Sequence, residues 1–221
     1  MGADGHRPDE RTTPRRYADG SLTLEREELV LADVDAWRAW LDGNHASSAG
    51  IWLVLAKKGS AGPTTVSYAQ ALEEALCFGW IDGQARSRDT VTFIQGFSPR
   101  RKRSPWSKRN TGIAERLVLE GRMAEAGIAE MDRAKSDGRW DAAYAGPADI
   151  EVPDELTAAL GARPKAKAMF ATLNSQNRYA ILYRIATAKR ADTRTRRIAQ
   201  FAAMLERGET IHPQKPAVKA P

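Results

Sequence analysis

The sequence predicts an α+β fold, in which a small and mostly antiparallel sheet packs with helices and is followed by a C-terminal helical segment. Short apolar runs bounded by glycine or charged residues, the pattern of strands, occur before residue 100. From residue 111 onward, apolar residues instead recur at helical spacing. With 221 residues and 42% apolar side chains, the chain can bury a sizeable core.

The first elements follow a polar N-terminal stretch. Residues 1–21 show no apolar period, and we expect them to form a disordered tail. Residues 22–145 are then expected to form the α+β domain. Asp33 is placed to cap a helix that carries Trp37 on its apolar stripe, and Ile51–Ala56 is typical of a buried strand.

A second helix and two further strands come next. Ser67 is placed to cap a helix that ends near Gly79. Gln84–Arg88 and Val91–Phe97 predict two strands joined by a short turn. The side chains expected to point inward from the helix are Ala69, Leu72, Leu76 and Phe78, and the single cysteine, Cys77, is expected in the core.

The remainder of the chain is predicted to be helical. Two helices should end near Gly121 and Gly138, because glycine commonly terminates a helix. Residues 146–153 are expected to be a linker to a helical C-terminal domain over residues 154–212. Residues 213–221 are expected to form a short tail.

Positive charge is concentrated in two segments. Residues 90–109 carry six basic side chains and no acid, and Arg163–Arg197 contains ten basic residues against Asp192 alone. Such segments attract phosphates, nucleic acid or anionic lipid headgroups, although a solvated basic surface explains the same charge. Asp192 is also placed to cap the last helix, and we expect nearby arginines to pair with acids of the first domain.

Composition narrows the class of protein. The N-terminus lacks the apolar region of a secretory signal, and no apolar stretch is long enough to span a bilayer. One cysteine and three histidines cannot build a Cys/His zinc cage, so we expect no metal and no cofactor, and a cytoplasmic location. None of the nucleophile-elbow, phosphate-loop, dinucleotide-binding or zinc-protease motifs occurs, which leaves the question of an enzyme open but unfavoured.

The segment around Asp82 combines an aromatic ring, an acid and two glycines at a predicted helix-to-strand turn. One interpretation makes Asp82 a ligand or proton acceptor in a cleft floored by Trp80, with Arg86 or Arg88 as its partner. The other makes Asp82 a turn residue that bonds its own backbone, with Trp80 filling the core.

A second motif lies in the basic loop that follows. Arg100 and Arg103 can bind a phosphate or carboxylate with two hydrogen bonds each, and Ser104 and Ser107 can add donors. Trp106 is then either an exposed ring on which a base or another ring stacks, or a core residue that holds the loop.

Five segments in order resemble the motif series of the YdeI/OmpD-associated, or bacteriocin-protection, family: ALCFGWIDG, FSPRRKRSPWSKRN, LEGRMAEAG, AKSDGRW and NRYAILYRIATAKRADTRTRRI. The resemblance runs from about Leu29 to Pro213. It implies a bacterial, cytoplasmic α+β protein linked to envelope stress and to protection from bacteriocins or cationic peptides, with no established reaction. The positions that match its motifs, which we expect to line one cleft, are Trp80, Asp82, Gly83, Pro99, Arg100, Ser104, Trp106, Ser107 and Asn110.

Three functions are therefore weighed. The first is a non-enzymatic stress-protection protein that binds an anionic small molecule or an acidic protein partner through the Arg100–Asn110 loop beside Asp82. The second is a nucleic-acid-binding module, whose affinity would fall steeply with salt. The third is an enzyme of unrecognised type that uses Asp82.

Overall fold

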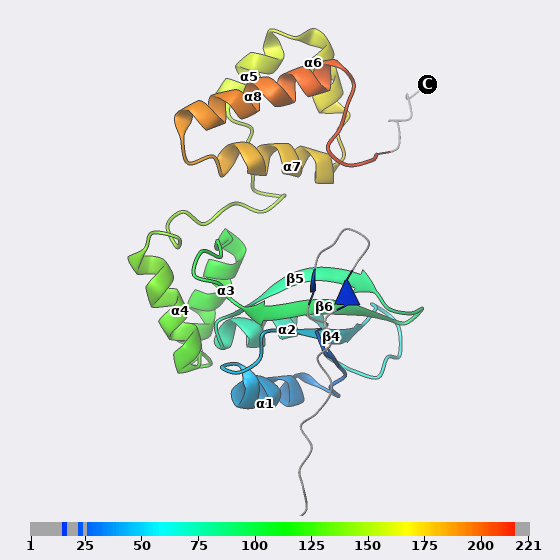
Figure 1. The fold of residues 1–221 in the computed structure, drawn as a ribbon, viewed down its shortest axis with the longest axis vertical. Helices are drawn as coiled ribbons and strands as arrows, with labels where there is room; N and C mark the ends of the chain where they lie inside the picture. The colour runs from blue at the N-terminus through cyan, green and yellow to red at the C-terminus, as the bar shows by residue number, and fades with distance from the viewer. Residues whose placement is uncertain (1–14, 17–21, 24–25, 215–221) are drawn as a thin grey trace, which may run out of the picture. The chain divides into compact units, whose positions relative to one another are not determined.

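The computed structural model describes residues 15–16, 22–23 and 26–214 of the 221-residue chain (Figure 1). These residues form eight helices and a four-stranded sheet, which confirms the predicted α+β fold. The helices are α1 (Val34–Asn44), α2 (Tyr68–Cys77), α3 (Lys108–Leu119), α4 (Glu125–Ser136), α5 (Asp154–Gly161), α6 (Pro164–Ala171), α7 (Ser175–Ala186) and α8 (Ala191–Glu206). The strands are β1 (Arg15–Arg16), β2 (Leu22–Thr23), β3 (Glu28–Leu29), β4 (Ile51–Ala56), β5 (Trp80–Ser87) and β6 (Thr92–Pro99).

The chain divides into two compact units. The first unit contains the described residues up to Ser104 together with Arg116–Arg133. The second unit contains Pro105–Glu115 together with the described residues from Ala134 onward. Most of the two predicted tails lies outside the described residues.

The sheet of the first unit has the strand order β3-β4-β6-β5 (Figure 1). Strand β6 pairs antiparallel with β4 and β5, whereas β3 runs parallel to β4, so the sheet is mostly antiparallel as predicted. A separate antiparallel pair joins β1 and β2. Strand β5 begins earlier than predicted, because Trp80 pairs with Pro99 and Asp82 with Phe97, where we had expected a turn.

Helices α1 and α2 begin at the residues predicted to cap them. The Asp33 carboxylate accepts a hydrogen bond from the backbone N–H of Ala36 at 2.9 Å. Ser67 and Gln70 bond each other's backbone N–H reciprocally, which satisfies two donors at the start of α2. The two helices lie against one face of the sheet (Figure 1).

The inward face of α2 differs from the prediction at one position. Leu72, Leu76, Cys77 and Phe78 are buried as expected, but Ala69 is exposed. Ala69 lies in the first turn of α2, three residues before Leu72, where the helix has not yet reached the core.

Ion pairs join α1, α2 and the end of α3 within the first unit. Glu74 is buried on α2, and its carboxylate accepts hydrogen bonds from Arg38 at 2.6 Å and from Arg122 at 2.5 Å. The adjacent Glu73 accepts from Arg116 at 2.5 Å and from Arg122 at 3.0 Å. Each of these guanidinium groups is therefore neutralised by a carboxylate.

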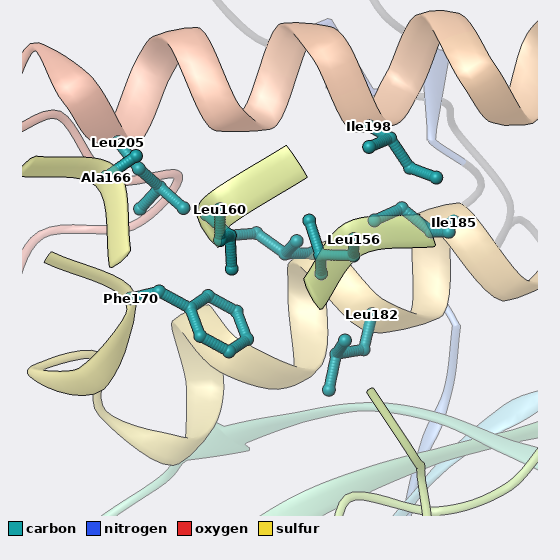
Figure 2. Packing of buried hydrophobic residues seen from close by; sticks show 9 residues of the cluster. Leu156, Leu160, Ala166, Phe170, Leu182, Ile185, Ile198 and Leu205 are labelled. Carbon is teal, nitrogen blue, oxygen red and sulfur yellow. The ribbon is translucent and has the colours of Figure 1, made fainter. Parts of the chain in front are cut away.

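In the second unit, helices α5 to α8 pack around one apolar core (Figure 2). Helical spacing placed these side chains on one stripe of each helix, and burial of the stripes holds the four helices together. The buried members are Leu156, Leu160, Ala166, Phe170, Ile181, Leu182, Ile185, Ile198 and Leu205.

The start of α8 corrects a further prediction. The helix begins at Ala191 with Arg190 as its N-cap residue, and Asp192 lies inside the first turn, where its carboxylate accepts from the N–H of Thr193. The predicted cap was therefore wrong. Arg194 pairs with Glu155 of α5 at 3.2 Å within the second unit, where α5 and α8 share one core. Pairing of the nearby arginines with acids of the first domain stays a prediction.

Across the part of the chain that the structure describes, no helix combines the length and the apolarity that crossing a membrane requires.

Candidate functional site

An aromatic ring and two guanidinium groups lie together on the sheet of the first unit. Trp52 on β4 pairs with Gly96 on β6. The next residue, Phe97, contacts the ring of Trp37 on α1 at 5.6 Å, and side chains alternate between the faces of a strand. Trp52 and Gly96 therefore lie on the face of the sheet that points away from α1.

The two guanidinium groups belong to residues far apart in the sequence. The central carbon of the Arg86 guanidinium is 4.5 Å from the centre of the Trp52 ring, and that of Arg26 is 5.9 Å away. Both distances lie in the range of cation–π attraction. The geometry therefore leaves Trp52 in contact with two positive charges.

Gly96 makes room for this arrangement. A Cβ atom at this position would lie 3.0 Å from Nη1 of Arg26 and 3.2 Å from Cζ3 of Trp52. A side chain here would require Arg26 and Trp52 to shift by a few tenths of an ångström. The glycine thus lets Arg26 lie close to the backbone of β6.

A third cation joins the group. Burial and then the charges of Arg101 and Arg86 lower the pKa of Arg26 from its ordinary value. Burial is the largest cause of this shift and the two like charges add to it, so Arg26 lies in the field of Arg101 and Arg86. Arg26, Trp52, Arg86 and Arg101 are called the Arg–Trp surface below.

The loop after β6 presents further positive charge. The backbone N–H of Arg101 donates to Oγ of Ser104 at 2.9 Å, and the N–H of Ser104 donates to the carbonyl of Arg101 at 2.8 Å. This turn holds Arg101, Lys102 and Arg103 as exposed residues. Two predicted site residues, Arg103 and Ser104, therefore belong to the same turn as Arg101, which is a member of the Arg–Trp surface.

Trp80 is a core residue. Only 1% of it is exposed, its Nε1–H donates to the carbonyl of His45 at 3.1 Å, and its ring meets those of Trp37 and Trp40 edge-on. The structure therefore supports the packing alternative for Trp80.

Asp82 has a different partner from the ones predicted. Its Oδ2 accepts a hydrogen bond from the hydroxyl of Tyr68 at 2.8 Å. Arg88 instead pairs with Glu28 at 2.9 Å, and Arg86 stacks on Trp52. Both predicted partners were wrong, because a β-bulge between Asp82 and Ala85 shifts the register of β5 and places Arg86 on the opposite face of the sheet from Asp82. A catalytic role for Asp82 stays a prediction.

The residues at the end of β6 are less exposed to solvent than a ligand-binding loop would be. Pro99 is the last residue of β6 and pairs with Trp80. Arg100 is 6% exposed, and its backbone N–H donates to the carbonyl of Gly79 at 3.1 Å. Arg100 is thus tied to the start of β5.

Three predicted site residues belong to the second unit. Trp106 is 1% exposed and its ring lies 4.8 Å from that of Trp140, so the interpretation as an exposed stacking ring was wrong. The hydroxyl of Ser107 accepts from the N–H of Asn110 at 3.1 Å, which caps the start of α3, and Asn110 is buried. That all the motif positions line one cleft stays a prediction.

Three members of the Arg–Trp surface were missed from the sequence: Arg26, Trp52 and Arg101. Trp52 was treated as part of a buried strand, and Arg26 precedes the first predicted helix. The pairing of Trp52 with a glycine across two strands is the signal that could have found them, since a glycine in a strand often marks close approach of another group.

The described residues contain no group of three or more His, Cys, Asp or Glu side chains that could hold a metal ion. The donors that converge on the sheet are guanidinium groups, which bind anions and not metals.

Two family models match two different stretches of the chain. Residues 149–208 match the family described as "Bacteriocin-protection, YdeI or OmpD-Associated", which confirms the resemblance for the C-terminal helices. Residues 29–130, where we expected the same resemblance, match a different model, described as "Domain of unknown function (DUF8412)". No curated protein and no solved structure matches the chain.

Proposed function

We propose that this chain, whose residues 149–208 match the bacteriocin-protection, YdeI or OmpD-associated family, binds an anionic ligand on the Arg–Trp surface of its first unit. One observation carries the proposal. Two guanidinium groups lie at the ring of Trp52 and the charge of Arg101 acts on one of them, and among the described residues none of these three arginines forms an ion pair with a carboxylate.

The physical argument rests on charge and shape. Like charges held together are repelled, and an anion placed among them replaces that repulsion by attraction. A guanidinium offers a planar fork of N–H donors that matches phosphate or carboxylate, and each charge-assisted hydrogen bond contributes about 1.5–3 kcal/mol. The expected ligand therefore carries a phosphate or carboxylate group.

This function needs no reaction. Sequestering an anionic small molecule, or docking an acidic partner, is a binding role that suits a non-enzymatic, cytoplasmic stress-protection or bacteriocin-protection protein. The proposal keeps the anion-binding hypothesis from the sequence and moves its centre from Arg100 to Trp52.

Nucleic acid is the second candidate. The exposed side chains of Lys102 and Arg103 extend the positive charge beyond Arg101, and Trp52 offers a ring on which a base could stack. A polyanion that spans several cations would then bind with strong salt dependence, with a slope of log affinity against log salt near −0.7 per phosphate for a single strand.

Calorimetry with pyrophosphate and with citrate at low salt tests the proposal. We expect the wild-type protein to bind at least one of them, and Arg86→Gln to weaken binding by at least about tenfold, since one charge-assisted hydrogen bond contributes about 1.5–3 kcal/mol and about 1.4 kcal/mol is tenfold in affinity. The matched control is Arg196→Gln, an exposed arginine on α8 that makes the same change of charge in the second unit.

Tryptophan fluorescence locates the binding event. Trp52 is half-buried, as is Trp40, and the ligand should change the emission of wild-type and Trp40→Phe protein but not of Trp52→Phe. Equal affinity of wild-type, Arg26→Gln and Arg86→Gln proteins would overturn the proposal. Tight binding of an oligothymidylate alone, with a steep salt slope that Arg86→Gln reduces, would favour nucleic acid instead.

A further inference from the structure

The second unit contains a cavity of about 490 Å³ along α7. Its walls include Tyr179, Tyr183 and Arg184 from α7, with Pro147 and His212 contributed by segments before α5 and after α8. This volume lies within the roughly 300–1,000 Å³ of small-molecule sites. None of the predicted site residues lines the cavity, and it is separate from the Arg–Trp surface.

Helix α7 uses two faces for two purposes. Leu182 and Ile185 point into the core of the four helices (Figure 2). Tyr179 and Tyr183 are spaced four residues apart, so they lie one above the other on a different face of α7. This second face carries the cavity and not the core.

Contacts among three tyrosines hold the aromatic wall. The ring of Tyr183 lies 5.6 Å from that of Tyr179 and 5.0 Å from that of Tyr144, the second contact being edge-on. The hydroxyl of Tyr179 donates to the carbonyl of Ala145 at 3.3 Å. Burial and the two neighbouring tyrosines raise the pKa of Tyr179 to about 12, so this hydroxyl remains a donor at neutral pH. The rings are thus positioned before any ligand arrives.

One end of the cavity is positively charged. Arg184 is exposed and, among the described residues that line the cavity, it is the one arginine or lysine, with no carboxylate beside it. Arg197 donates from its guanidinium to the backbone carbonyl of Arg184, which links α8 to the end of α7. The cavity therefore combines an aromatic wall with a cationic end.

We infer that this cavity binds a small aromatic carboxylate, with its ring against Tyr179 and Tyr183 and its carboxylate on the guanidinium of Arg184. A planar ring can stack offset or edge-on against the tyrosines. A single guanidinium fork matches one carboxylate, and a mostly apolar wall disfavours a ligand of higher charge such as a phosphate ester.

The test uses two probes of the same shape, naphthalene-2-carboxylate and its neutral amide, titrated by calorimetry into the full chain. The carboxylate should bind at least about fivefold more tightly than the amide, which is the size of effect expected for one partly exposed charged contact. Arg184→Gln should remove that preference while leaving amide binding unchanged. Tyr183→Ala should weaken both probes, and circular dichroism checks that each variant is folded.

The control is again Arg196→Gln, which should leave the affinity for both probes as in the wild type. No binding of either probe, equal binding of acid and amide, or an Arg184→Gln variant that keeps the preference would each overturn the inference. Arg86→Gln should bind both probes as tightly as the wild type does, which assigns the binding to the second unit. Loss of carboxylate binding in Arg86→Gln would instead place it on the Arg–Trp surface and would overturn the inference.

Discussion

Arginine has opposite roles on two sides of the first unit. On the helical side, Arg38 and Arg122 converge on the buried carboxylate of Glu74 at 2.6 and 2.5 Å. On the sheet side, Arg26 and Arg86 converge on the uncharged ring of Trp52. The same side-chain type therefore closes a charge network in one place and leaves an unbalanced positive field in the other.

The difference shows how to distinguish arginines that stabilise the fold from arginines that are available to bind a ligand. A guanidinium paired with a buried carboxylate contributes to folding, because removal of either partner leaves a charge without compensation. Guanidinium groups gathered around an aromatic ring contribute little to folding, because the attraction to the ring is offset by mutual repulsion. Stability measurements should therefore distinguish the two sides.

The largest expected effect is at Glu74. Glu74→Gln removes the negative charge between Arg38 and Arg122, and we expect the free energy of unfolding to fall by about 2–4 kcal/mol, less than for a fully buried pair because both arginines are partly exposed. Urea denaturation measures it. The matched control, Glu120→Gln, removes an exposed carboxylate and should cost far less stability than Glu74→Gln. Equal losses in the two variants would contradict the comparison.

A smaller effect is expected on the sheet side. Arg86→Gln loses a cation–π contact of about 0.5–1 kcal/mol but relieves repulsion with Arg26, so the net change in unfolding free energy should stay below about 1 kcal/mol. Added salt screens repulsion, so it should stabilise the wild type more than the variant. Urea melts at low and moderate salt check both points. A loss as large as that of Glu74→Gln would make Arg86 a structural residue.

The smallest effect is expected at the β5–β6 turn. Arg88 in this turn pairs with the carboxylates of Glu28 and Asp89, whereas Arg86, two residues earlier, lies over the ring of Trp52. Hydrogen bonds from the Thr92 hydroxyl and from the N–H groups of Val91 and Thr92 lower the pKa of Asp89 to about 2. A carboxylate with a lowered pKa stabilises the fold above its ordinary value near 3.9, and this contribution is lost as pH falls through about 2.

Melting temperatures of wild-type and Asp89→Ala protein test this dependence. Their difference should be constant between about pH 5 and 7 and should shrink as the pH falls below about 4. A difference that grows on acidification would show that Asp89 is not stabilised as a carboxylate in the folded protein.

Much of the fold could be predicted because its signals are local. The caps at Asp33 and Ser67 depend on hydrogen bonds over three residues, and Ile51–Ala56 coincides with β4. The predictions that were wrong concern residues whose local pattern favours one structure while contacts with distant residues impose another. The Trp80–Gly83 segment looked like a turn because of its glycines, but pairing with β6 extended it as a strand.

The candidate sites were harder to predict. Arg86 was the one member of the Arg–Trp surface proposed from sequence, and it had been paired with Asp82. The cavity on α7 was not anticipated at all. Periodicity identifies which residues share a helix face, but it does not reveal which distant segment crosses that face.

By itself, the sequence determined the order of the elements, the apolar stripes and the two basic segments, because these follow from backbone propensity, capping and the spacing of side chains along one stretch of chain. The tertiary structure alone decided that Arg26 and Arg86 meet at Trp52, and that Tyr144 and His212 reach the face of α7. These outcomes depend on strand register and on the approach of segments many residues apart, where the alignment of elements across space sets which charges and rings become neighbours.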